Sequence, residues 1–262
     1  MNLRNASLIA FSILTGGLNT ACYHLQPAVV PMAALPYPAS DSSDQRAGDL
    51  VVLLPGLGDY ATAFEKQGLV AHLRGPEFAE QPVDVLAVNA HFKYYRNKTA
   101  IERLHADVIV PAREAGYERI HLIGISLGGF GALRYLRDYP GEVQSVTLIA
   151  PYVGERKYYG ELASPEPAPE GQATESENPW PWIRALPQDV LARVYLGYGE
   201  SDRFAEGHAA LATLLDPEHV VVEPGKHRWK VWKTIWPELL EAMKSDRIAS
   251  LESAELLAVR TR

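Results

Sequence analysis

The strongest constraint on this chain is a short apolar run that ends in Gly124-x-Ser126-x-Gly128 and continues directly into a helical pattern. Residues 120–125 have the composition of a buried strand, and residues 132–136 continue as a helix. On so sharp a strand-to-helix turn the serine hydroxyl is exposed, because the flanking glycines remove Cβ atoms that would clash there. The pattern predicts that Ser126 is a nucleophile. The alternative is a tight turn whose serine only caps the helix.

Strand-like and helical patterns alternate from residue 49 onward. Continuous apolar runs, typical of strands buried on both faces, occupy residues 49–54, 83–88, 120–125, 145–151, 191–196 and 219–222. Alternation of this kind predicts a parallel, doubly wound α/β sheet that binds ligands at the carboxyl ends of its strands. The 262 residues, 47% of them apolar, suffice for one sizeable core.

Residues 1–22 differ from the rest of the chain. They combine the basic Arg4, an apolar stretch over residues 6–18 and small residues before Cys22, the only cysteine. The stretch is short for a membrane span and has the form of a secretory signal. It resembles a bacterial lipoprotein signal, with Asn19 as a departure from that pattern, which implies export across the cytoplasmic membrane and lipidation of Cys22 in the cell envelope. A plain secretory signal and a buried N-terminal helix are the alternatives.

Residues 23–48 predict an extended tether between this signal and the folded part. Four prolines and a Ser/Asp-rich run at residues 40–44 interrupt any regular period. We therefore expect the folded domain to begin near Asp49 and to cover residues 49–244, followed by a helical tail at residues 245–262.

Charge and spacing exclude several functions. The net charge is -7, so no basic stripe is available for a nucleic acid. Histidines and acidic residues show no ligand spacing such as His-x-x-x-His, so we expect no metal site and no cofactor. The composition leaves the oligomeric state open.

Over residues 49–244 the chain resembles the α/β-hydrolase family. The resemblance implies a doubly wound, mostly parallel sheet of about six strands, because the antiparallel strands that usually begin the family's sheet have no room here unless the tether contributes.

The resemblance also implies a triad in the order nucleophile, acid, histidine. Asp202 follows the fifth of the predicted strands in a Gly-x-x-Asp turn, with Glu200 as the rival acid. The other reading of Asp202 is an N-cap for the next helix, a role that competes for the same carboxylate oxygens. His227, in a Gly-x-His-x-Trp pattern after the last strand, is the expected base.

The family takes its oxyanion donors from two backbone amides, which correspond here to Leu57 and Leu127. Gly56 and Gly58 would let the first loop approach a substrate, although a plain strand-to-helix turn is the alternative. Residues 153–187 fill the position at which the family inserts lids. Trp180 and Trp182 there are packing residues or line an acyl pocket.

These observations predict a serine hydrolase that cleaves a small-molecule carboxylic ester through an acyl-enzyme and is held at the membrane by an N-terminal lipid. A thioesterase or amidase of the same fold is the nearest alternative. A non-catalytic envelope protein that only binds a ligand is the alternative from a different class.

Overall fold

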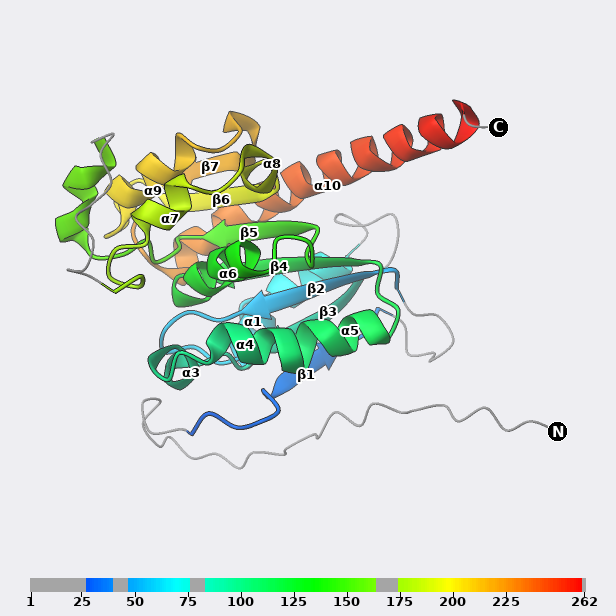
Figure 1. Cartoon of the computed structure of the whole chain (residues 1–262), viewed down its shortest axis with the longest axis horizontal. Coiled ribbons are helices and arrows are strands. Elements are labelled where there is room, and N and C mark those ends of the chain that lie inside the picture. The colour runs from blue at the N-terminus through cyan, green and yellow to red at the C-terminus, as the bar shows by residue number, and fades with distance from the viewer. Residues whose placement is uncertain (1–26, 40–46, 76–82, 164–173, 261–262) are drawn as a thin grey trace.

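The protein is described here by a computed structural model that covers residues 27–39, 47–75, 83–163 and 174–260. The predicted signal and Cys22 lie outside the described residues. Figure 1 shows one twisted sheet with helices on both sides and the C-terminal helix extending past it. The seven strands lie in the order β1-β3-β2-β4-β5-β6-β7. Their bounds are β1 Ala34–Tyr37, β2 Asp49–Leu54, β3 Val83–Val88, β4 Arg119–Ile125, β5 Ser145–Ile149, β6 Val194–Gly199 and β7 Val220–Glu223.

Strands β2 to β7 pair in parallel, which confirms the predicted α/β sheet, but the described sheet has one strand more than expected. The additional strand, β1, comes from the segment predicted to be a tether and pairs antiparallel with β3. Pro36 is compatible with this strand because an edge strand needs no donor on its outer side. The expectation that the fold begins near Asp49 is therefore wrong: β1 covers the edge of β3, and its prolines hid the strand pattern.

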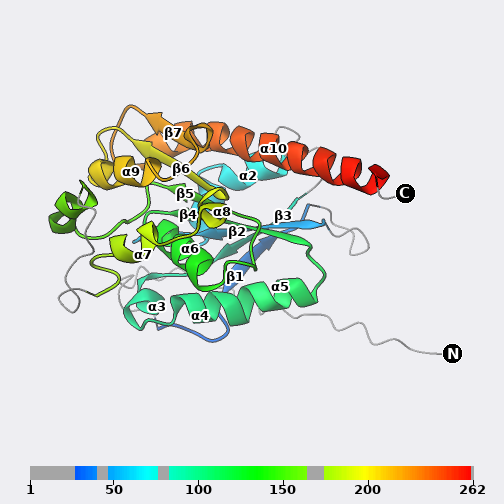
Figure 2. The same cartoon turned by 45° about the horizontal axis from the view of Figure 1, so that its top comes forward.

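The described helices pack on the two faces of the sheet. One face is covered by a group with bounds α3 Phe92–Arg96, α4 Ala100–Leu104, η2 His105–Ile109, α5 Val110–Glu114, α6 Leu127–Asp138, α7 Trp180–Arg184, α8 Gln188–Leu191 and α9 Ala205–Ala212. The other face is covered by α1 Thr62–Lys66, α2 Leu69–Arg74 and α10 Trp229–Arg260. Two short 3-10 segments, η3 Arg156–Ala163 and η4 Pro217–His219, lie in the connections. Figure 2 shows α2 and α10 on one side of the sheet and α4 to α6 on the other.

Each central strand supplies both cores by alternation of its side chains. In β2, Val52 and Leu54 pack under α4 to α6, whereas Val51 and Leu53 pack under α2 and α10. All four are buried. A strand that is covered on both faces has no solvent side, which explains why its sequence is a continuous apolar run.

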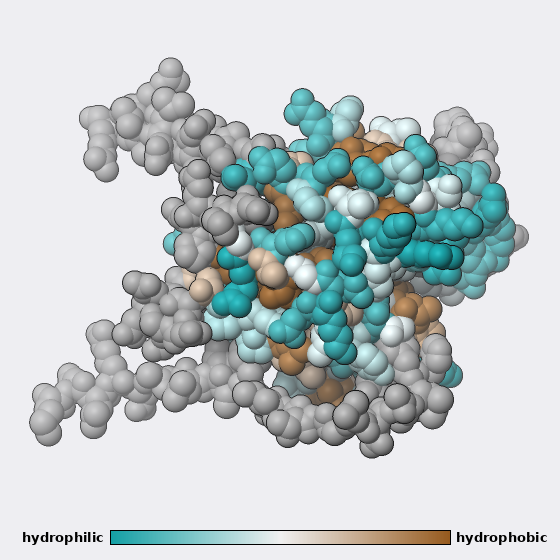
Figure 3. Space-filling model, turned by 180° about the vertical axis from the view of Figure 1, so that it is seen from behind, coloured by the Kyte–Doolittle hydropathy of each residue, from teal (hydrophilic) through white to brown (hydrophobic). Residues whose placement is uncertain are grey.

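The outer surface is mixed in character. On the face turned away in Figure 1, apolar side chains lie in small patches between hydrophilic ones (Figure 3). No helix in the described part of the chain is both long and apolar enough to cross a membrane.

Candidate active site

The serine of the opening motif lies in a strained turn at the centre of the sheet. Ser126 follows β4 and precedes α6 with φ 52° and ψ -113°, a backbone conformation that residues other than glycine rarely adopt. Its N–H donates to the carbonyl of Ile149 at 2.9 Å, and its carbonyl accepts the N–H groups of Tyr152 at 2.9 Å and Phe130 at 3.1 Å. The end of β5 and the first turn of α6 therefore hold this conformation from both sides.

Both motif glycines are required by close packing. A Cβ on Gly124 would collide with the carbonyl of Gly128, and a Cβ on Gly128 would collide with the carbonyl of Leu54 at the end of β2. The first turn of α6 therefore lies directly against the carboxyl ends of β2 and β4. This contact fixes the position of Ser126 above the sheet.

The structure brings the three predicted triad side chains together. Ser126 Oγ lies 3.0 Å from Nε2 of His227, and Nδ1 of His227 lies 2.7 Å from Oδ2 of Asp202. An ionised carboxylate only accepts, so Nδ1 carries the proton and the neutral imidazole accepts the serine hydroxyl at Nε2. The arrangement orients a base toward a buried hydroxyl.

Each of the two carboxylate oxygens of Asp202 accepts one hydrogen bond. Oδ2 accepts from His227, and Oδ1 accepts the backbone N–H of Phe204 at 2.9 Å, just before α9. The N-cap of α9 is Phe204 and no side chain caps this helix, so the alternative interpretation of Asp202 as the helix cap is wrong. Burial raises the pKa of Asp202, but the hydrogen bonds from His227 and Phe204 outweigh it and hold the pKa below its ordinary value. Glu200, the rival acid, is exposed.

Neighbouring groups fix the acid and histidine loops. The carbonyl of Gly225 accepts the N–H of Ser201 at 2.8 Å, which joins the two loops next to the site. The His227 ring makes T-shaped contacts with two aromatic rings, with centroid distances of 5.4 Å to Phe204 and 5.0 Å to Trp232. These contacts restrict the rotation of the imidazole.

A second histidine, His208, lies beneath this region. It is fully buried on α9 and donates from Nε2 to the carbonyl of Pro151 at 2.7 Å. Burial lowers the pKa of His208 to about 4, despite the opposing effects of the Pro151 carbonyl and of Asp202. His208 is therefore neutral at physiological pH and packs α9 against the segment that follows β5.

The two predicted oxyanion residues also lie beside Ser126. Leu57 and Leu127 line the same cavity as the serine, and a Cβ added to Gly56 would lie 3.4 Å from Cβ of Ser126. A contact that the sequence did not reveal holds this loop, because Nε1 of Trp229 donates to Asp59 at 3.0 Å. The tryptophan in the Gly-x-His-x-Trp pattern thus links the histidine loop to the loop of Leu57.

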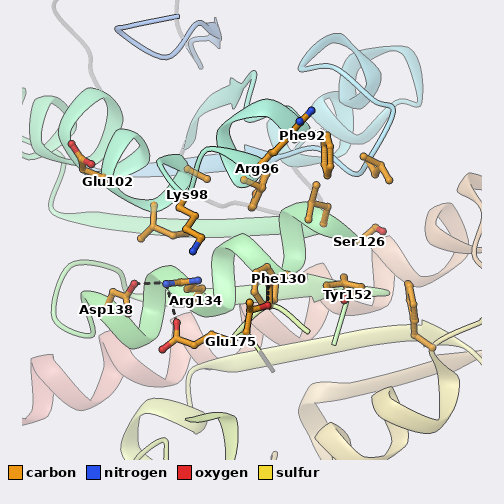
Figure 4. A pocket seen from close by; sticks show the side chains of 18 of the residues that line it. Phe92, Arg96, Lys98, Glu102, Ser126, Phe130, Arg134, Asp138, Tyr152 and Glu175 are labelled. Atoms are coloured by element: carbon orange, nitrogen blue, oxygen red, sulfur yellow. Dashed lines mark hydrogen bonds and ion pairs between the residues drawn. The ribbon is translucent and has the colours of Figure 1, made fainter. Parts of the chain in front are cut away.

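Ser126 opens into an elongated cavity of about 830 Å³, which we call the Ser126 cavity. Side chains at Leu127, Phe130, Arg134 and Asp138 recur every three or four residues and form one stripe along α6. Figure 4 shows the cavity passing from Ser126 and Phe130 to charged side chains farther along. We call the part next to Ser126, with Phe130, Tyr152 and Phe204, the reactive end. The part formed by Lys98, Arg134, Asp138 and Glu175 is the charged end.

This stripe was not predicted, although its three- and four-residue spacing is present in the sequence that follows Ser126. The two tryptophans of the 153–187 insertion behave as packing residues. Trp180 is buried against Tyr159, and Trp182 packs near Phe130 under the guanidinium of Arg137.

Comparisons with known proteins agree with this architecture. A sequence model of the alpha/beta hydrolase fold matches residues 49–178. No curated protein matches the chain. A ferulic acid esterase of known structure superposes with a TM-score of 0.56 at 15% identity, covering 77% of this chain and 86% of its own.

Two further solved structures are similar. The peroxisomal alpha-beta-hydrolase Lpx1 of Saccharomyces cerevisiae has a TM-score of 0.56 at 16% identity and covers 88% of each chain. A monoacylglycerol lipase from Paleococcus ferrophilus has a TM-score of 0.51 at 17% identity, covering 80% of this chain and 99% of its own. At such identities the likeness concerns the fold.

Proposed function

We propose that this chain, which has the α/β-hydrolase fold, is a serine hydrolase that cleaves carboxylic esters. The observation that carries the proposal is the hydrogen-bonded series from Asp202 through His227 to Ser126, which opens into the Ser126 cavity. The names of similar structures, among them a ferulic acid esterase and a monoacylglycerol lipase, support an ester as the bond attacked.

The first half of the reaction forms an acyl-enzyme. As Oγ of Ser126 attacks the ester carbonyl carbon, Nε2 of His227 takes the hydroxyl proton. Oδ2 of Asp202 stabilises the imidazolium through its bond to Nδ1. The tetrahedral intermediate collapses, the C–O bond to the alcohol breaks, and His227 gives its proton to the departing alkoxide.

The oxyanion of each tetrahedral intermediate needs fixed donors. We assign these to the backbone amides of Leu57 and Leu127, the residues that lie beside Ser126 at the cavity wall. In the second half, water attacks the acyl carbon with His227 as base and releases the acid, which restores the serine hydroxyl.

The test is hydrolysis of 4-nitrophenyl butyrate by the wild type and by Ser126→Ala. We expect the variant to lose about 10⁴-fold or more in kcat, as for other triads that lose a member. Equal rates for the two proteins would refute the proposal that Ser126 is the nucleophile of an esterase. Matched thioester and amide substrates with the same acyl group decide between the ester and the alternative bonds.

We also propose that the protein is exported and held in the bacterial envelope by a lipid on Cys22. The lipoprotein-like pattern of residues 1–22 supports this. Intact-mass measurement of membrane-extracted protein should give a chain that begins at Cys22 with added acyl mass. A soluble chain that retains Met1 would contradict the proposal.

A further inference from the structure

The charged end of the Ser126 cavity holds two cations, Lys98 and Arg134, and the proposed reaction uses neither. Lys98 follows α3, and in Figure 4 its ammonium group points into the cavity toward Arg134. Within the described residues Lys98 forms no ion pair. The other basic group of this wall, Arg96, points away from the cavity in the same view.

The acids that line the cavity near Lys98 are already paired with arginines. Glu102 lies 2.8 Å from Arg103. Arg134 lies 3.7 Å from Asp138 and 3.0 Å from Glu175, while Arg137 lies 2.6 Å and 3.3 Å from the same two carboxylates. This set of two cations and two anions is neutral. Lys98 is therefore the cation of the charged end that no acid of the described residues pairs with.

The backbone at Lys98 favours a different residue. Its φ of 60° is left-handed, and it follows a helix end in which Lys98 N–H donates to Tyr95 at 3.0 Å and Thr99 N–H donates to Tyr94 at 2.9 Å. Glycine is the usual residue at this position of such a helix end, because a Cβ is costly there. Lys98 therefore occupies a backbone position at which a glycine would be less costly.

The distance between the two ends defines the shape of a ligand. Ser126 and Arg134 are separated by eight residues of helical rise, which corresponds to about 12 Å. Between them the wall carries Phe92 and Phe130, so an apolar segment fits next to the reactive carbonyl.

We propose that Lys98 binds a carboxylate at the far end of the substrate, so that the preferred esters carry an apolar chain that ends in an anionic group. The inference rests on the proposed ester hydrolysis for its placement of the scissile bond. A cation that faces the cavity is available for such a group, because the neighbouring acids, Glu102 included, are already paired with arginines.

A pair of isosteric substrates tests the proposal. One is the mono-4-nitrophenyl ester of octanedioic acid, and the other has a carboxamide in place of the free carboxylate. For the wild type we expect kcat/KM to be about fivefold higher for the carboxylate, the size of a partly exposed ion pair. The preference should shrink in about 0.5 M salt, where the Debye length is only a few ångströms.

Two variants locate the effect. Lys98→Met should abolish the preference while leaving the rate on the neutral substrate within about twofold. Lys93→Met is the matched control, because it removes the same charge from α3 outside the cavity lining, and it should keep the preference. Equal rates on both substrates, or a preference that survives in Lys98→Met, would overturn the proposal.

A binding measurement separates this inference from the proposed activity. With Ser126→Ala, calorimetry should show tighter binding of the carboxylate ester than of the carboxamide, and Lys98→Met in that background should remove the difference. Lys98-dependent binding without hydrolysis would sustain the anion site and refute the esterase. Hydrolysis of neutral esters without Lys98-dependent binding would support the esterase and refute the anion site. Neither hydrolysis nor Lys98-dependent binding would refute both proposals.

Discussion

The two ends of the Ser126 cavity are built in different ways. At the reactive end, Ser126 and Asp202 are buried, and each is held by backbone groups that follow a strand of the sheet. At the charged end, Lys98 is exposed at the end of a five-residue helix, and Glu175 lies in a turn of the insertion. The first end is part of the core, and the second is a surface.

This difference separates chemistry from selectivity. Attack on a carbonyl needs atoms fixed within fractions of an ångström, which only groups supported by the packed sheet provide. Recognition of a charge tolerates a flexible side chain, since a Lys ammonium is a point charge on a mobile stem. Changes at the reactive end should therefore remove activity, whereas changes at the charged end should alter preference.

The largest effect is expected from Asp202→Asn. A carboxylate accepts from Phe204 and His227 at once with separate oxygens, whereas an amide has one oxygen and must present its NH₂ group to one of these two donors. We expect kcat to fall by about 10⁴-fold, because the imidazole loses its orientation and its counter-charge. Steady-state hydrolysis of 4-nitrophenyl butyrate measures this.

Glu200→Gln is the matched control, since it removes the same charge from the same loop at an exposed position. It should retain activity within about twofold. A large loss of kcat in Glu200→Gln with little loss in Asp202→Asn would assign the role of the acid to Glu200. Because Glu200 is exposed, this result would contradict the statement that the reactive end is built from buried groups.

The reactive end could be predicted from the sequence because its residues occupy fixed places relative to strands. Ser126, Asp202 and His227 each follow an apolar run, and parallel strands bring their carboxyl ends to one edge of the sheet. The sequence could not predict which partner each oxygen of Asp202 accepts from, because this depends on the conformation of the turn that joins Asp202 to α9.

The charged end and the first strand could not be predicted in the same way. Lys98 and Arg134 are 36 positions apart in the chain and share a cavity only because α3, α4 and α6 cover the same face. Strand β1 is short and contains Pro36, so its sequence shows no strand pattern. It is a strand because it pairs with β3, which the local sequence cannot reveal.

A smaller effect is expected on stability at the reactive end, through His208. Its pKa is about 4 in the folded protein, below the ordinary value. Between pH 6.5 and pH 4 the unfolded chain therefore binds a proton that the folded chain does not, so stability falls as the pH is lowered through this range. The part due to His208 between pH 7 and pH 5 is about 2 kcal/mol.

The measurement is urea unfolding of the wild type and His208→Gln at both pH values. The variant should be less stable overall, but its loss of stability on going to pH 5 should be smaller by that amount. His72→Gln, which removes an imidazole from an exposed position, is the control for the substitution itself. If the pH dependence of the free energy of unfolding is the same in His208→Gln as in the wild type, the titration of His208 does not contribute to it.

The smallest effect concerns the charged end and should have the opposite sign. Glycine at position 98 removes the Cβ from a left-handed residue, so Lys98→Gly should raise the free energy of unfolding by about 0.5 to 1 kcal/mol. Asn97→Gly is the control one residue earlier, where φ is -77° and glycine should destabilise by a similar amount. Urea midpoints measure both. If Lys98→Gly stabilises the fold and also abolishes the carboxylate preference, Lys98 serves binding and not stability. If Lys98→Gly destabilises the fold, Lys98 supports the fold, and the contrast between a reactive end that is part of the core and a charged end that serves only selectivity is wrong.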